Sequence, residues 1–148
     1  MSELGSALTN YFVELESEGI GKLVDVKCSD TFFDYIYSHY PWEIFTIDWS
    51  KIEGSVCINI SQASNNEINA IISKSPLAKY KYIGLFYLPD EPGFVCSFEF
   101  LKEHLWSLLR GPGDGYLIGV NEQNNYIKIP EKPDFIEIYA GNWIAWGN

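Results

Sequence analysis

The stretch YLIGVNEQNNYIKIPEKPDFIEIYAGNWIAW, residues 116–146, decides the fold that we expect for this chain. It contains four short runs rich in apolar, β-branched and aromatic residues, separated by segments rich in Asn, Pro and Gly. This pattern predicts two successive hairpins. In the first, residues 116–120 pair with 126–129. In the second, residues 134–139 pair with 143–146. Hairpins join antiparallel strands, so this part of the chain predicts an antiparallel sheet.

Helices and strands are expected to be interspersed in the rest of the chain. The expected helices run from Leu4 to near Gly19 or Gly21, from Thr31 to His39 after a Ser29–Asp30 cap, from about Glu67 to Ser73, and onward from a Ser97 cap. The expected strands cover residues 22–28, 43–49, 55–60 and 79–88. Together these elements predict one α+β domain over residues 1–148, with a mainly antiparallel sheet and helices packed on one face.

Composition indicates which partners suit the protein. The chain of 148 residues holds 20 Asp and Glu against 10 Lys and Arg, a net charge of −10. This charge opposes contact with phosphate backbones and anionic lipid, so we expect no nucleic-acid and no membrane partner, and a basic partner is favoured. Aromatic residues make up 16% of the chain, more than simple filling of a core needs. Some of them should therefore lie on the surface.

No motif indicates a reaction, and we expect neither enzyme activity nor a cofactor. His39 and Glu43 are spaced i, i+4, but Pro41 between them breaks the helix that would bring them together, and Glu103 beside His104 should point in another direction. Cys28, Cys57 and Cys96 lie in apolar stretches without a Cys-x-x-Cys pair, which favours buried free thiols over a metal site or a disulfide. The first residues lack the pattern of a secretory signal and no run of 18 apolar residues occurs, so we expect a cytoplasmic protein.

Acidic and aromatic residues are the candidate contacts to a basic partner. The set is Asp30, Asp34, Asp90, Glu91, Asp114, Trp42 and Trp146. We expect the acids at exposed positions. Asp30 and Asp34, spaced i, i+4 on one helix face, repel each other, and a basic partner would relieve that repulsion. Tryptophan is enriched at interface centres. Trp143 and Trp146 stand three apart in an expected strand, so they should point to opposite faces of the sheet.

The chain resembles bacterial toxin-immunity proteins, in particular the immunity proteins of contact-dependent growth inhibition systems. The segments that carry the resemblance are the acidic helix end at residues 14–18, the turn at residues 88–93 and the ending at residues 134–144. The resemblance implies a stoichiometric inhibitor, a monomer or weak dimer, that binds a secreted toxin domain, often a nuclease. Such an inhibitor blocks the active site or the substrate surface of the toxin. The resemblance assigns no residue roles.

Other function classes remain open. The aromatic residues could line an apolar pocket of a small-molecule-binding module. They could also be interface residues of a subunit in a larger assembly, which predicts stable self-association.

Overall fold

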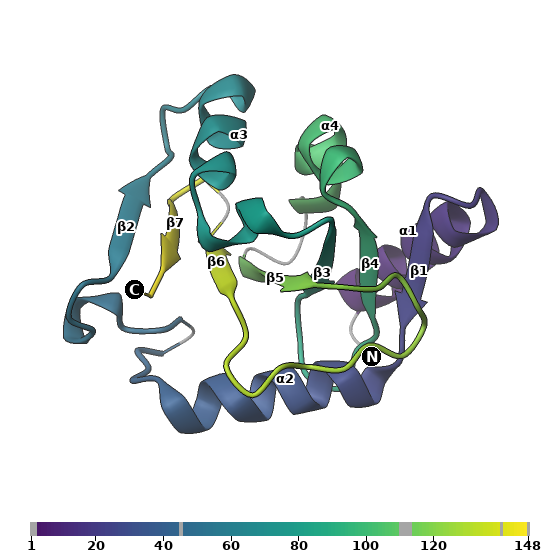
Figure 1. The fold of residues 1–148 in the computed structure, drawn as a ribbon, viewed down its shortest axis with the longest axis horizontal. Helices are drawn as coiled ribbons and strands as arrows, with labels where there is room; N and C mark the ends of the chain where they lie inside the picture. Colours follow the sequence, from purple (N-terminus) through teal and green to yellow (C-terminus); the bar gives the residue numbers. More distant parts are fainter. Residues whose placement is uncertain (1–2, 45, 110–113, 140, 148) are drawn as a thin grey trace.

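The computed structural model describes the backbone of residues 3–44, 46–109, 114–139 and 141–147, and the side chains of residues 9–44, 46–104, 115–139 and 141–147. One seven-stranded sheet has the order β1–β4–β3–β5–β6–β7–β2, with every pair of neighbours antiparallel (Figure 1). The strands are β1 (Gly21–Val24), β2 (Val56–Asn59), β3 (Tyr82–Phe86), β4 (Gly93–Ser97), β5 (Asp114–Val120), β6 (Phe135–Tyr139) and β7 (Trp143–Trp146). The helices are α1 (Glu3–Ser17), α2 (Val26–His39), α3 (Asn65–Ser73) and α4 (Phe98–Leu109), with 3-10 helices η1 (Trp49–Lys51) and η2 (Pro76–Lys79). The expected α+β class and antiparallel sheet are confirmed.

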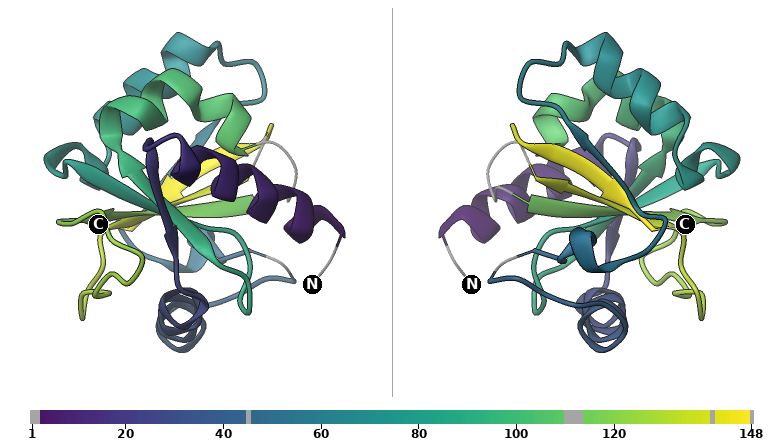
Figure 2. Two further views of the ribbon diagram at one scale, coloured as in Figure 1. Left: turned by 90° about the vertical axis from the view of Figure 1, so that its right-hand side faces the viewer. Right: turned by 90° about the vertical axis from the view of Figure 1, so that its left-hand side faces the viewer.

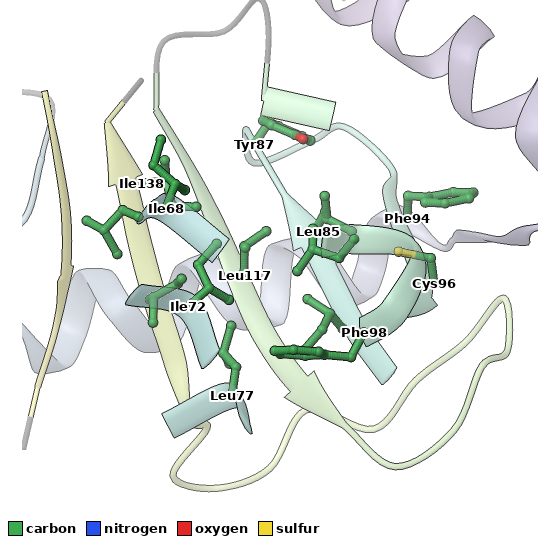
Figure 3. Packing of buried hydrophobic residues seen from close by; sticks show 14 of the residues in the cluster. Ile68, Ile72, Leu77, Leu85, Tyr87, Phe94, Cys96, Phe98, Leu117 and Ile138 are labelled. Atoms are coloured by element: carbon green, nitrogen blue, oxygen red, sulfur yellow. The ribbon is translucent and has the colours of Figure 1, made fainter. Parts of the chain in front are cut away.

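Helices cover both faces of the sheet, whereas we expected them on one face. Figure 2 shows α1, α3 and α4 on one side of the sheet and α2 on the other. In the core under the first group, Ile68 and Ile72 of α3 lie over Leu117 and Ile138 of the sheet (Figure 3). The expectation was wrong because the central strands are buried on both sides, as the four buried consecutive residues Ile83–Phe86 show. Such a run has no alternation that would reveal a solvent face.

The second core lies between the sheet and α2. Cys28, Phe32 and Ile36 are spaced four residues apart along one face of the helix, and all three are buried. Phe32 is the centre of this core. Its ring centroid lies 5.4 Å from that of Phe86 and 5.6 Å from that of Phe135. This aromatic packing fixes α2 against the sheet.

Helix α2 begins earlier than expected, at Val26. Asp25 is its N-cap, and its carboxylate accepts a hydrogen bond from the Lys27 backbone N–H at 2.8 Å. The strand expected over residues 22–28 therefore ends at Val24, and the predicted Ser29–Asp30 cap lies inside the helix. Both positions offer a capping side chain. The earlier start adds Cys28 and Ser29 to the buried side of the helix.

Two other helix starts are confirmed. Ser64 and Glu67 form a reciprocal capping box at the start of α3. At the start of α4, the Ser97 hydroxyl accepts a hydrogen bond from the Phe100 backbone N–H at 3.0 Å. In both segments the capping hydroxyl lies three residues before the backbone N–H that it accepts from.

Two expected strands are absent. In the described part of residues 43–49 no strand forms, and residues 126–129 lie in the connection between β5 and β6. The antiparallel partner of β5 is therefore β6, not residues 126–129. Ile127 is buried in the second core instead, and its backbone C=O accepts a hydrogen bond from the Cys28 thiol at 3.3 Å. The expected β6–β7 hairpin is confirmed, with Gly141 of its turn at a φ of 76°.

A polar network fastens the start of β6 to η2. The Tyr80 hydroxyl donates a hydrogen bond to Asp134 Oδ2 at 2.6 Å, and Lys79 Nζ lies 3.0 Å from the same oxygen. Burial alone would raise the pKa of Asp134, but the hydrogen bonds from Tyr80 and Lys79 outweigh it and lower that pKa. The hydrogen bond to Asp134 raises the pKa of Tyr80 to about 12. The Tyr80 ring also covers Gly119, where a Cβ would overlap it.

We expect this network to make stability depend on pH. Because the pKa of Asp134 is lower in the folded chain, its contribution is present above the ordinary Asp pKa of about 3.9 and is lost as the pH falls through the folded pKa. Tyr80→Phe should therefore lower the free energy of unfolding more at about pH 7 than at about pH 2. Urea denaturation at both pH values measures this, with Tyr126→Phe at an exposed position as the control. An equal loss at both pH values would contradict the expectation.

Candidate functional site

The outward side of α2 brings together four of the seven candidate contact residues. The Asp90 backbone N–H donates a hydrogen bond to the Asp30 carboxylate at 2.9 Å, which joins the β3–β4 turn to the helix. Asp34 follows Asp30 by about one helical turn and is exposed. Trp42 lies just beyond the end of the helix, where its indole N–H donates to the Ile36 C=O at 3.0 Å. Acids and an aromatic side chain thus meet on one surface.

Tyr37, which is not among the predicted contact residues, completes this surface. Its side chain is 50% exposed, and its ring centroid lies 4.9 Å from that of Trp42 and 5.9 Å from that of Phe33. The i, i+3 spacing from Asp34 could have indicated it. The α2 surface is defined as Asp30, Asp34, Tyr37, Trp42 and Asp90.

The acidic charge of the α2 surface is not neutralised within the described chain. The ion pairs found among described residues involve Asp48, Asp134, Glu99 and Glu103. The carboxylates of Asp30, Asp34 and Asp90 take part in none of them. Asp90 has a φ of 65°, a left-handed conformation that Asp tolerates better than most residues, and its backbone N–H is satisfied by Asp30. The turn therefore holds the Asp90 side chain at an exposed position.

The remaining candidate residues lie elsewhere. Glu91 is only 9% exposed, so the expectation of an exposed position is wrong for it. Trp146 packs against the first core and Trp143 against the second, which confirms that they point to opposite faces. Trp146 is thus on the other side of the sheet from α2. The backbone of Asp114 pairs with Tyr139, but the Asp114 side chain lies outside the described residues.

A pocket of about 610 Å³ lies beside the β6–β7 hairpin. Its lining residues are Glu43, Ile44, Thr46, Tyr139 and Trp143. The Tyr139 and Trp143 rings stack with centroids 4.8 Å apart, and Ile44 is 87% exposed at the pocket. An aromatic lining and a volume of this size are typical of small-molecule sites.

Trp143 also contacts a buried carboxylate, Glu137, which is not among the predicted site residues. Glu137 is fully buried, and each of its carboxyl oxygens accepts two hydrogen bonds. The donors are the Trp49 indole at 2.9 Å, the Trp143 indole at 3.1 Å, the Ile47 backbone N–H at 3.1 Å and the Tyr116 hydroxyl at 2.9 Å. All four donors are neutral. A buried carboxylate is tolerated only with such complete satisfaction, so Glu137 holds the 46–49 segment onto the sheet.

Replacing Glu137 by Gln should destabilise the protein strongly. The side chain keeps its size, but an NH₂ group then faces two of the buried donors. We expect the free energy of unfolding to fall by about 2–4 kcal/mol, measured by urea denaturation. Hydrogen exchange at the Ile47 amide should become faster. Glu131→Gln, at an exposed position, is the matched control. A change in the Glu137 variant as small as in this control would show that the four hydrogen bonds do not hold the segment.

The three cysteines differ in exposure. Cys28 and Cys96 are buried as expected, but Cys57 is exposed, because β2 is the last strand of the sheet. Burial raises the pKa of Cys96 to about 12 and also raises that of Cys28. Burial, followed by the charge of Glu137, raises the pKa of Cys57. All three thiols are therefore largely protonated at neutral pH, and of the three only Cys57 is accessible to a thiol reagent.

Comparison of the chain with protein-family models, with curated proteins and with solved structures returns no match. Among the described residues, no group of three or more His, Cys, Asp or Glu side chains is placed to hold a metal ion. No helix in the described part of the chain has the length and apolar character needed to cross a bilayer. The α2 surface and the pocket are therefore interpreted from their own chemistry.

Proposed function

We propose that this protein is an inhibitor of the immunity type that binds a basic toxin domain, such as a nuclease, through the α2 surface. The observation that carries the proposal is the hydrogen bond from Asp90 to Asp30. It brings acids that are 60 residues apart in the chain to the helix that also presents Asp34 and Tyr37. Binding there would cover the active site or the substrate surface of the toxin.

The charge of the protein supports a basic partner. A toxin domain that acts on nucleic acid is basic because it must bind phosphate, and a net charge of −10 attracts it over a long range. Asp34 and Asp90 are exposed, so they retain much of their hydration at the rim of an interface. Charges in such positions chiefly accelerate association and select the partner.

The aromatic part of the α2 surface supports tight binding. Tyr37 offers half of its side chain to solvent, while the rings of Phe33 and Trp42 hold its other side. A side chain held in this way loses little conformational entropy when a partner covers it. Tyr and Trp are also the residue types that dominate interface energies. In the proposed interface, Tyr37 is therefore the central contact, and the acids lie at the rim around it.

Two substitutions separate these contributions. The partner is first sought by co-expressing each neighbouring reading frame with this protein and selecting the frame whose toxicity it suppresses. With that toxin domain, Asp34→Lys should slow association by about threefold to tenfold at low salt, and the difference should vanish near 1 M salt. Tyr37→Ala should raise the dissociation rate by about 30-fold with little change in association. Surface plasmon resonance measures both rates.

Glu103→Lys is the matched control, because it makes the same charge change on α4, on the opposite face of the sheet. It should slow association much less than Asp34→Lys. Equal effects of the two charge reversals, or unchanged rates in all three variants, would reject the α2 surface as the binding site. If no neighbouring reading frame is toxic and suppressed, the inhibitor function itself is rejected.

The pocket beside Tyr139 and Trp143 favours a second candidate function, small-molecule binding. A panel of metabolites should then contain a compound that raises the Tm of the protein. Ile44→Asp should abolish that shift, because it places a charge at the apolar pocket, whereas Asp34→Lys should leave it unchanged. A panel without any stabilising compound, or a shift that Ile44→Asp does not alter, would count against this function.

A further inference from the structure

We propose that a second copy of this chain binds the free edge of strand β2, so that the two sheets join antiparallel about a twofold axis. Figure 1 shows β2 and β1 at opposite ends of the sheet. An end strand carries backbone N–H and C=O groups that point away from its sheet and can pair with another strand. The two ends of this sheet differ in how these groups are satisfied.

The β1 edge is closed by the chain itself. The Leu23 N–H donates a hydrogen bond to the Glu16 carboxylate, and the Leu23 C=O accepts one from the Asn125 side chain at 2.6 Å. The next outward N–H, that of Asp25, donates to the Asn125 C=O at 2.6 Å. These groups are therefore not free to bind another strand.

The β2 edge is open. The hydrogen bond from the Ile60 N–H to the Asn142 C=O, at 2.9 Å, fixes which residues of this strand face β7. By the alternation of an antiparallel ladder, Ile58 pairs with β7 through its backbone, whereas Cys57 and Asn59 direct their backbone groups outward. Within the described residues, no group forms a hydrogen bond with these outward N–H and C=O groups.

The absence of charged residues along the β2 edge favours a second copy of this chain as the partner of β2. Residues 54–66, which include all of β2, contain no Asp, Glu, Lys or Arg. Two molecules of net charge −10 repel each other, and an uncharged edge is where they approach with least repulsion. A basic partner gains nothing from such an edge. The strand also lacks the Lys and Pro residues with which proteins commonly protect edges.

One register uses every outward group. If Ile58 faces Ile58 of the second copy across the axis, each Cys57 lies opposite Asn59 of the other copy. These two residue pairs then form four hydrogen bonds. The ladder cannot extend further at its start, because the Ser55 N–H already donates to the Ile52 C=O. The interface is therefore short, and the dimer is expected to be weak.

Proline at position 57 tests this pairing. Cys57→Pro removes only an N–H that faces away from β7, a place where edge strands tolerate proline. Sedimentation equilibrium of the wild type should show a mass that rises with concentration from 16.9 kDa toward twice that value. Cys57→Pro should raise the dimer Kd by about tenfold or more, because two of the four hydrogen bonds are lost, and Cys57→Ser should leave the Kd unchanged. A wild type that stays monomeric up to about 1 mM, or a proline variant that dimerises as tightly, would overturn the proposal.

Cross-linking gives a second measurement that does not depend on the folding of the proline variant. In the proposed register the two Cys57 residues are diagonal neighbours about 7–8 Å apart, within reach of a short bis-maleimide. The wild type should give a cross-linked dimer and Cys57→Ser should not. A wild type that gives no cross-linked dimer would also overturn the pairing. Both experiments use the protein without any toxin, so their failure leaves the inhibitor function untouched.

Discussion

The second core depends on the buried carboxylate of Glu137. Its four hydrogen bonds reach donors in the 46–49 segment, in β5 and in β7, so that one side chain ties three parts of the chain to β6. A carboxylate that is buried away from water must keep all of its hydrogen-bond donors. Because two of these donors belong to the 46–49 segment, the segment can lie in only one position against the sheet. Trp49 is thereby placed with its ring centroid 6.2 Å from that of Phe135, which closes the core beyond the end of α2.

That core is also what makes α2 a rigid platform. The helix buries one side against the sheet through Phe32 and its neighbours and presents the other side to solvent. An exposed acid on a fixed helix acts as a fixed charge, and an exposed ring supported by two others has little conformational freedom. The α2 surface therefore combines features that a flexible loop of the same composition would lack.

The sequence predicts the features that are local and misses those set by distant contacts. The Ser97 cap and the β6–β7 turn are confirmed because their signals lie within a few residues. Residues 126–129 have an alternating pattern typical of a strand, yet Ile127 is buried against α2 and never enters the sheet. All three acids of the α2 surface, and Trp42, were among the predicted contact residues. No sequence signal, however, shows that the Asp90 backbone binds Asp30, because the turn and the helix meet only in the folded chain.

The order of strands in the sheet has a consequence for biosynthesis. The residues of β2 are made well before those of β7, which is the strand that β2 pairs with, Val56 lying opposite Trp146. The ribosome makes β7 last of the seven strands, so β2 and the donors of Glu137 on the 46–49 segment have no partner until residues 135–146 have been made. A topology with such distant pairings folds slowly. A nascent chain that stalls before residue 143 therefore leaves the β6 edge unpaired and β2 detached, a form suited to capture by chaperones or proteases.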